Sequence, residues 1–330
     1  MSLEEHRREV DRIDREILKL LGERLQVARA IGEAKLKSGA PVYAPQREEQ
    51  LLRSITEAAP AIPASGLRAV YREIISLSIG AQMANPVAYL GPEGSFTQQA
   101  QIRAFGTSVP SLPLRAIGDI FAAVESGEAS YGVVPVENST EGVVSHSLDL
   151  LAESDLKVVA QVTLSVEQCL VGQGPLDQVK KVLSKDIALA QIIARDPQGQ
   201  AAVASATAAE SRGVPILARG IQDRRDNATR FFVIAKTANT VGAKDEVTSV
   251  VLTLKHEPGA LQGALAAFSD RGINLIRIES RPSHRRAWEY LFFIDFPGHW
   301  DTAAVQAAVT ELKGRCEVVK WLGSYPQSAG

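Results

Sequence analysis

The sequence predicts a multidomain protein with a helical segment, an α/β segment and a small α+β segment, in that order along 330 residues. Apolar residues recur at helical spacing up to about residue 84, and beyond it short apolar runs alternate with helical stretches. The last part reads strand, helix, strand, strand, helix, strand, which is the order of a ferredoxin-like domain. We expect domains at 1–84, 85–238 and 247–326, with a polar linker at 236–246.

Composition and charge exclude several classes of protein. A net charge of −2 argues against nucleic-acid binding, and no apolar run reaches the length of about 18 residues that a membrane helix needs. The N-terminus lacks a signal-peptide pattern, the isolated Cys169 and Cys316 make no disulfide framework, and the five histidines do not cluster. We expect a cytoplasmic protein that binds neither nucleic acid nor membrane and needs no metal or cofactor.

One long helix is predicted from about Leu3 to Lys37, followed by helices that begin near Pro45 and end near Met83. The segment 60–66 between the latter two reads as a loop. The first helix would be roughly 50 Å long, more than a domain of this size can cover. Its apolar stripe therefore predicts a homodimer or a higher homo-oligomer.

Basic residues on this helix suggest a small dianionic ligand. Arg24 and Lys35 lie about three turns apart on one face, whereas Arg7 lies about a quarter of a turn from Arg24 and should serve a different site. For any single arginine, the alternative is a solvated coiled-coil face.

The helical segment resembles the all-helical chorismate mutase domain, in which chorismate rearranges to prephenate inside an intertwined dimer. The matching positions are Arg7, Arg24, Lys35, Arg47, Glu48, Ser78 and Gln82. The resemblance implies that Arg7 (crossing into the partner's site) and Arg24 clamp the carboxylates with Ser78, and that Arg47 also binds substrate.

The resemblance further implies that Lys35 and Gln82 donate to the breaking ether bond. Glu48 would hold the ring hydroxyl and, when protonated, could also donate to the ether oxygen. One position departs from the family: Ala44 stands where an aspartate often binds the ring hydroxyl. We expect weaker substrate binding with the chemistry intact.

The middle segment predicts an α/β domain with largely parallel strand pairing. The expected strands are 86–90, 131–136, 156–161, 168–171, 201–204 and 230–235, and the expected helices are 117–126, 143–152 and 187–194.

Three polar segments lie at strand ends, where open α/β sheets bind anionic ligands. They are Gly91-Pro-Glu-Gly-Ser-Phe-Thr, Glu137-Asn-Ser-Thr-Glu-Gly and Asn227-Ala-Thr-Arg-Phe-Phe. Each alone could be only a turn. Together they resemble prephenate dehydratase, a two-lobed fold similar to periplasmic binding proteins, which converts prephenate to phenylpyruvate without a cofactor.

The resemblance implies that Thr229 is catalytic and that substrate binds to Ser95, Thr97, Asn138, Ser139, Gln191 and Arg230. For Arg230, a strand-end ion pair is an equal alternative. After Ser184, about one strand and one helix of the family pattern are missing, which predicts a shortened second lobe. Ser205-Ala-Thr aligns with a later helix of the family and does not replace the missing substrate-binding segment.

The last segment resembles an ACT domain, a small ligand-sensing module, on Glu257-Pro-Gly-Ala-Leu, Gly272-Ile-Asn-Leu and Glu279-Ser-Arg-Pro. The resemblance implies that two such domains bind phenylalanine through Gly259, Ala260, Leu261, Asn274, Glu279, Ser280 and Arg281. A purely structural dimerisation module is the alternative.

The order of the three segments resembles the bifunctional chorismate mutase–prephenate dehydratases of phenylalanine biosynthesis. Two alternatives stay open. The first is a mutase whose shortened middle domain does not turn over, and the second is an amino-acid-binding regulator in which the middle and last segments only sense a ligand.

Overall fold

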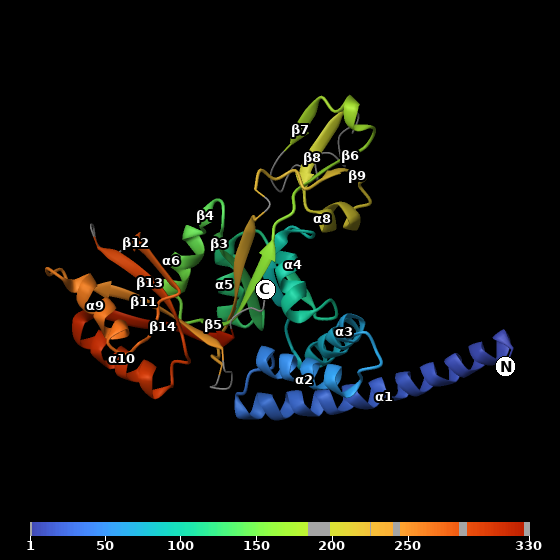
Figure 1. Ribbon diagram of the computed structural model, residues 1–330, viewed down its shortest axis with the longest axis horizontal. Helices are drawn as coiled ribbons and strands as arrows, with labels where there is room; N and C mark the ends of the chain where they lie inside the picture. The colour runs from blue at the N-terminus through green and yellow to red at the C-terminus, as the bar shows by residue number, and fades with distance from the viewer. Residues whose placement is uncertain (1, 184–198, 225, 240–244, 284–288, 327–330) are drawn as a thin grey trace. The chain divides into compact units, whose positions relative to one another are not determined.

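The computed structural model describes residues 2–183, 199–224, 226–239, 245–283 and 289–326 (Figure 1). It has two compact units. The first comprises Met1–Pro86 with Phe105–Pro110, and the second comprises Val87–Ala104 with Ser111–Gly330. No helix in the described part of the chain combines the length and the hydropathy needed to cross a membrane.

The first unit contains three helices, α1 (Leu3–Ser38), α2 (Pro45–Ala58) and α3 (Ala64–Gln82). The predicted long helix is confirmed at 36 residues. It begins with a capping box in which Ser2 and Glu5 satisfy each other's backbone N–H groups, and it ends at Gly39 in the left-handed conformation.

The third helix begins at Ala64, inside the segment that was expected to be a loop. Pro63 fixes a helix-compatible φ of −54° just before it, and Leu67 is buried in its first turn. Gly66 and Ser65 suggested a turn, but packing of Leu67 outweighs their weak helix propensity.

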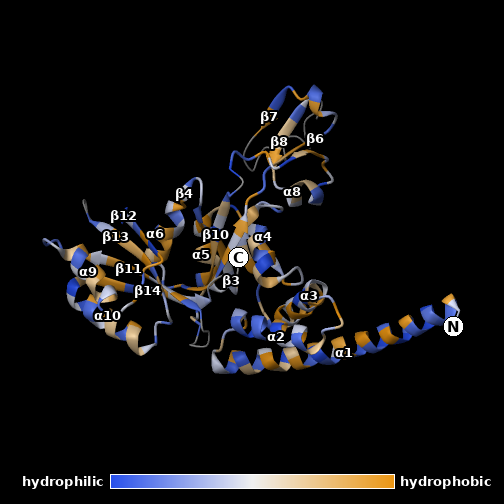
Figure 2. Ribbon diagram, in the orientation of Figure 1, coloured by the Kyte–Doolittle hydropathy of each residue, from blue (hydrophilic) through white to orange (hydrophobic). Residues whose placement is uncertain are grey.

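Helix α1 packs against α3, yet most of its apolar stripe stays exposed. Only Ala28 and Gly32 of α1 are buried. Figure 2 shows hydrophobic residues continuing along α1 toward its N-terminus, and the exposed ones include Val10, Ile13, Ile17, Leu20, Val27 and Ile31.

The second unit begins with a sheet in the order β2-β1-β3-β10-β5, with β4 paired to β3. Its strands are β1 (Val87–Leu90), β2 (Ser111–Leu114), β3 (Tyr131–Asn138), β4 (Gly142–Val143), β5 (Lys157–Ser165) and β10 (Ala228–Ala235). Helices α4 (Phe96–Phe105), α5 (Ile117–Ser126) and α6 (Ser145–Glu153) connect them.

A smaller sheet forms the second lobe, in the order β7-β8-β6-β9. It contains β6 (Cys169–Gly172), the 3-10 helix η1 (Leu176–Gln178), β7 (Lys181–Leu183), β8 (Gln200–Ala204), α8 (Ala206–Ser211) and β9 (Ile216–Arg219). The helix expected at 187–194 lies outside the described residues. Ser205 caps α8 through its side chain, so Ser205-Ala-Thr does open a helix.

The expectation of largely parallel pairing is wrong. Strand β1 pairs parallel with β2 and β3, and β7 with β8, whereas the other strand pairs in the described parts of the two lobes are antiparallel. The reason is the excursion to the second lobe. Strand β5 leads the chain out and β10 leads it back, so these neighbours run in opposite directions.

The C-terminal part has the predicted ferredoxin-like order, with an antiparallel sheet β12-β13-β11-β14. Its elements are β11 (Glu246–Leu254), α9 (Ala260–Ser269), β12 (Arg277–Pro282), β13 (Tyr290–Pro297), α10 (Ala303–Arg315) and β14 (Cys316–Pro326). Strand β12 begins at Arg277, after a segment in which Ile273 N donates to Phe268 O and stays attached to the end of α9.

This C-terminal sheet shares a hydrophobic core with the first lobe. Val251, Phe293, Leu322 and Tyr325 lie in one buried cluster with residues of β3, α5, α6 and β10. At Gly323, a Cβ atom would lie 2.1 Å from Val158 O, so only glycine allows β14 to approach β5 this closely.

Candidate active sites

Arg24 of α1 is held against α3. Its Nη1 donates to Ile74 O at 3.2 Å and to Ser78 Oγ, and Ser78 Oγ donates to Ile74 O at 2.8 Å. The guanidinium and the hydroxyl predicted to bind one carboxylate are therefore adjacent.

Lys35 and Glu48 form the second part of this site. Lys35 Nζ donates to Val42 O at 3.0 Å, and burial lowers the pKa of Lys35 against the opposing effect of Glu48. Burial raises the pKa of Glu48 to about 7, although Arg72 and Lys35 act in the opposite direction. A carboxyl group with this pKa is partly protonated at neutral pH and can then donate a hydrogen bond.

Gln82 lies where α3 touches α1. Its Nε2 donates to Ser78 O at 2.9 Å, and its buried Oε1 has no hydrogen-bond partner in the described part of the chain. A Cβ atom on Gly32 would lie 3.0 Å from Cα, Cβ and Cγ of Gln82, so Gly32 permits this close packing. The interior glycine was visible in the sequence, but its contact with Gln82 was not.

Arg7 and Arg47 are both exposed, and neither makes a hydrogen bond or ion pair with this group in the described part of the chain. Arg72, whose charge lowers the pKa of Glu48, was missed because its sequence position gives no signal of that contact. Ala44 is the N-cap residue of α2 and makes no side-chain cap. Alanine at position 44, where the family often has aspartate, therefore also leaves the N-terminus of α2 without a side-chain cap.

Two of the three dehydratase-like segments meet where β3 and β10 pair, with Thr229 opposite Asn138. Asn138 Nδ2 donates to Thr229 Oγ1 and to Asn227 Oδ1, both at 2.8 Å. Asn138 Oδ1 accepts from Thr140 N and Glu141 N, both at 2.9 Å. Four hydrogen bonds thus fix the Asn138 amide beside the Thr229 hydroxyl.

Ser139 holds the same strand ends together. Its Oγ donates to Asp226 O at 3.2 Å and accepts from Ala228 N at 2.9 Å. Asn227 was not expected to take part, although it lies in the motif that contains Thr229.

Ser95 and Thr97 lie in the loop and helix that follow β1. Ser95 Oγ donates to Leu90 O at 2.8 Å and accepts from Gln98 N at 3.2 Å, while Thr97 is buried. The hydroxyl of Ser95 therefore caps α4 in this structure. Gln191 lies outside the described residues.

The same loop meets the second lobe. Ser205 Oγ donates to Gly94 O at 2.8 Å, and a Cβ atom on Gly94 would lie 2.5 Å from Cα of Ala208. Gly94 also has a φ of +84°, so both its backbone conformation and the close approach of Ala208 require glycine there. The loop after β1 consequently lies at the junction of the two lobes.

Arg230 takes part in an ion pair. Its Nη1 lies 3.2 Å from Asp295 Oδ2 and 3.9 Å from Glu137 Oε2. Of the two interpretations of Arg230, these contacts support the ion pair. The carboxyl of Asp295 is buried, which raises its pKa, while Ser249, Arg277 and Arg230 partly offset this effect.

The predicted effector residues lie at the start of α9, in the loop that precedes β12, and on β12 itself. Gly259 has a φ of +78° at the N-cap of α9 and supplies no side-chain cap, Leu261 is exposed, and so is Asn274. Glu279 and Ser280 lie on β12. Arg281 makes two hydrogen bonds of 3.1 Å with Asp149 of α6.

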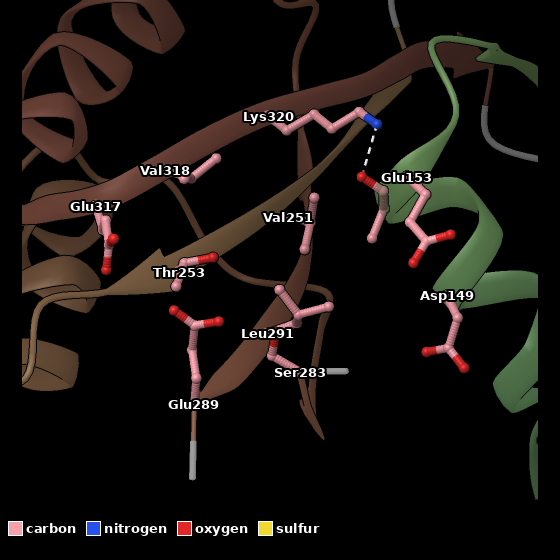
Figure 3. A pocket seen from close by; sticks show the side chains of 11 residues that line it. Asp149, Glu153, Val251, Thr253, Ser283, Glu289, Leu291, Glu317, Val318 and Lys320 are labelled. Atoms are coloured by element: carbon pink, nitrogen blue, oxygen red, sulfur yellow. Dashed lines mark hydrogen bonds between the residues drawn. The ribbon is translucent and has the colours of Figure 1, made fainter. Parts of the chain in front are cut away.

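A pocket of about 180 Å³ lies between α6 and the C-terminal sheet (Figure 3). Its lining includes Asp149, Glu153, Glu289 and Glu317, and Lys320 Nζ donates across it to Ala152 O at 2.8 Å. Among the described residues, none of the predicted site residues lines this pocket.

The sequence matches three families in succession. Residues 6–83 match Chorismate mutase type II, residues 87–195 and 188–239 match Prephenate dehydratase, and residues 248–314 match the ACT domain.

Two relatives and one solved structure are similar along most of their length. The bifunctional chorismate mutase/prephenate dehydratase of Aquifex aeolicus is 41% identical, over 99% of this chain and 98% of the relative. The protein of the same description from Neisseria gonorrhoeae is 38% identical, over 97% of this chain and 96% of the relative. The prephenate dehydratase of Arthrobacter aurescens in complex with L-Phe has a TM-score of 0.65 at 27% identity, over 73% of this chain and 90% of that one.

Two features of the comparisons bear on the expected shortening of the second lobe. The alignment with the Aquifex relative spans 357 positions, more than the 330 residues of this chain, so the relative contains residues that this chain lacks. The two Prephenate dehydratase matches share residues 188–195, so separate parts of the family pattern meet there. With all three segments matched in order and both relatives aligned nearly end to end, the chain belongs to the bifunctional chorismate mutase/prephenate dehydratase family.

Proposed function

We propose that this protein converts chorismate to prephenate in its helical domain and prephenate to phenylpyruvate in its two-lobed domain. Phenylalanine, the amino acid made from phenylpyruvate, would inhibit it through the ACT domain. The proposed domains are 1–84, 85–238 and 247–326, and the proposed location is the cytoplasm. Family membership supports both activities, and the L-Phe complex of the Arthrobacter relative supports the effector.

The mutase step needs positioning and charge stabilisation, because a pericyclic rearrangement uses no nucleophile. Arg24 and Ser78 would hold one carboxylate, and Lys35, Gln82 and protonated Glu48 would face the ether oxygen as its bond to carbon breaks. The contact between Arg24 and Ser78 and the raised pKa of Glu48 support these roles.

A homodimer would complete the mutase site with the partner's Arg7. In one chain Arg7 is exposed, and so are Val10, Ile13 and Ile17 on the same half of α1. A second copy of α1–α3 would cover this stripe and bring an arginine to the first chain's site.

The dehydratase step breaks the bond to the ring carboxylate, releases carbon dioxide and expels the ring hydroxyl group as the ring becomes aromatic. The leaving oxygen needs a proton or a strong hydrogen bond, and together with that proton it departs as water. Thr229 Oγ1 accepts a hydrogen bond from Asn138, so its own O–H is directed elsewhere and can donate to the leaving group. This contact is the observation on which the dehydratase proposal chiefly rests.

Prephenate turnover, measured as phenylpyruvate formed, tests the proposal. The rival is a mutase with an amino-acid-sensing but inactive middle region. That rival predicts chorismate consumption and phenylalanine binding with no phenylpyruvate, and it predicts that Thr229→Val leaves phenylalanine binding unchanged.

A further inference from the structure

Two rows of residues cross the paired strands β3 and β10. Thr229 lies opposite Asn138 in one row, and Arg230 lies opposite Glu137 in the next. Because neighbouring residues of a strand point to opposite faces, the polar pair and the charged pair face different sides of the sheet. The charged pair is thus one peptide bond away from the proposed catalytic pair on both strands.

The charged pair meets a second cross-strand pair from the ACT domain. Arg277 of β12 lies opposite Asp295 of β13. Arg230 Nη1 lies 3.2 Å from Asp295 Oδ2, and Arg277 Nε lies 2.9 Å from Glu137 Oε2. Arg230 and Glu137 of the first lobe therefore each pair with a residue of opposite charge in the ACT domain, Asp295 and Arg277 respectively. The Asp295 and Arg277 side chains are only 4% and 9% exposed, so solvent screens these pairs weakly.

Asp295 is anchored in turn to the ACT core. Ser249 Oγ donates to Asp295 Oδ1 at 2.5 Å and lies 2.6 Å from the hydroxyl of Tyr325, which is fully buried. The Tyr325 ring contacts Phe232 of β10 with ring centroids 5.4 Å apart. The ion pair of Asp295 with Arg230 therefore links β13 to β10, and the ring contact of Tyr325 with Phe232 links β14 to the same strand.

The pairing of β3 with β10 is irregular next to the row formed by Arg230 and Glu137. Glu137 is opposite Arg230, but Pro135 is opposite Phe231, so Val136 is an extra residue on β3. Such bulges redirect side chains and are common next to active sites. Here the bulge directly adjoins the charged row.

We propose that Glu137, Arg230, Arg277 and Asp295 form a positioning cluster through which the ACT domain sets the geometry of the Asn138–Thr229 pair. This proposal rests on the proposed function only because it treats the Asn138–Thr229 pair as catalytic. Arg230 acts in this cluster as a positioning residue and does not contact the substrate. Because binding equilibria are reciprocal, an effector that displaces β12 or β13 changes the substrate site by the same coupling free energy.

The first test uses hydrogen exchange, because it needs no turnover. The amides of Thr140 and Glu141 donate to Asn138 Oδ1, so their protection reports the position of the Asn138 side chain. Asp295→Asn keeps the shape and removes the charge. We expect exchange of both amides to quicken at least about tenfold, whereas amides within β5 keep their protection and show that the unit is folded.

Asp149→Asn is the matched control. It removes another ion pair between the first lobe and the ACT domain, that of Asp149 with Arg281, whose side chains are 18% and 14% exposed. We expect it to leave the Thr140 and Glu141 amides unchanged. Equal exchange of these amides in wild type, Asp295→Asn and Asp149→Asn would overturn the proposal.

Kinetics supply the second test. Arg230→Gln should lower the kcat for prephenate about tenfold or more with a smaller change in KM, and Arg230→Lys should recover part of the loss. If Asp295→Asn does not fold, Arg230→Gln takes its place in the exchange experiment. A rise in KM alone would indicate that Arg230 binds substrate and would contradict a positioning role. If the wild-type protein forms no phenylpyruvate, the proposed function fails, and the exchange comparison still decides the positioning cluster.

Discussion

Asn138 and Thr229 lie 91 positions apart in the chain, and the side-chain amide of Asn138 donates a 2.8 Å hydrogen bond to the Thr229 hydroxyl. The pair exists because β3 leads to one motif and β10 begins with the other, and the two strands are neighbours in the sheet. Asn138 can in this way direct the Thr229 proton toward a substrate bound at the strand ends.

Replacing Thr229 by valine should remove dehydratase activity with little change in fold. Valine keeps the shape but offers no proton, so kcat for phenylpyruvate formation should fall between about 100-fold and about 10,000-fold. Thr229→Ser should retain much of the activity. Chorismate consumption by the same preparations is the internal control, and a Thr229→Val protein with normal kcat would exclude the role given to Thr229.

Mutase activity should depend on the protonation of Glu48. Its pKa is raised to about 7 by burial, so the carboxyl is protonated and able to donate below that pH. The mutase kcat should therefore fall as pH rises through about 7, and Glu48→Gln, which keeps a donor, should flatten the profile. The free energy of unfolding of the helical unit should decrease as pH rises from the ordinary carboxyl pKa of 4.5 to the folded pKa of about 7 and level off above it, since ionised Glu48 is unfavourable when buried.

A pH series of mutase kcat from about pH 5.5 to about pH 8.5 checks this prediction. If wild type and Glu48→Gln give the same profile, Glu48 does not act as a donor.

Gly32→Ala should damage the mutase site. The new Cβ atom would press on Gln82 at 3.0 Å and displace α1 from α3, so mutase kcat/KM should fall roughly 10- to 100-fold. Gly22→Ala is the matched control, because it lies in the same helix with no atom within 4 Å of the new Cβ, and should raise helix stability by about 1 kcal/mol. Equal mutase activity in both variants would contradict the packing argument.

Ala44→Asp should strengthen both the helix and the mutase site. A carboxylate at the N-cap of α2 would add about 1 kcal/mol to the free energy of unfolding and lower the KM for chorismate by holding its ring hydroxyl. Ala44→Asn should give the same stability with a smaller change in KM. Thermal melts measure the effect of the cap on stability, and KM measures the effect on substrate binding. An unchanged KM for Ala44→Asp would show that position 44 does not reach the substrate.

Complementation between chains should test the dimer. Arg7→Gln and Lys35→Gln proteins should each be nearly inactive as mutases. When the two are unfolded together and refolded as a mixture, about a quarter of the activity should return, because half of the dimers are mixed and each has one intact site. Activity that stays at the level of the separate variants would mean that Arg7 does not act across chains.

The sequence predicted those parts of the fold that depend on local pattern. Helix α1 was predicted almost to the residue because its apolar stripe continues without a break, and the observed capping box and Gly39 lie at the same two ends. The direction of β10 was not predictable, since it depends on the excursion to the second lobe that separates β5 from β10.

The candidate sites were also predictable only where a local motif marks the residue. The resemblance to prephenate dehydratase assigned Asn138 and Thr229, from two motifs at strand ends, to one substrate site, and the structure places their side chains in contact. The partners of Arg230 were not predictable, because Asp295 lies 65 residues away in another domain and only the packing of the ACT sheet brings it there. Arg72 was missed for a related reason, since its effect on Glu48 arises between two helices.

Prephenate given to the purified protein, with phenylpyruvate measured, tests the proposed function most directly. We predict steady turnover, which would show that the second lobe, expected to be shortened, still completes a working site around Asn138 and Thr229. A protein that consumes chorismate, accumulates prephenate and forms no phenylpyruvate would contradict it, and would leave a mutase joined to an amino-acid sensor.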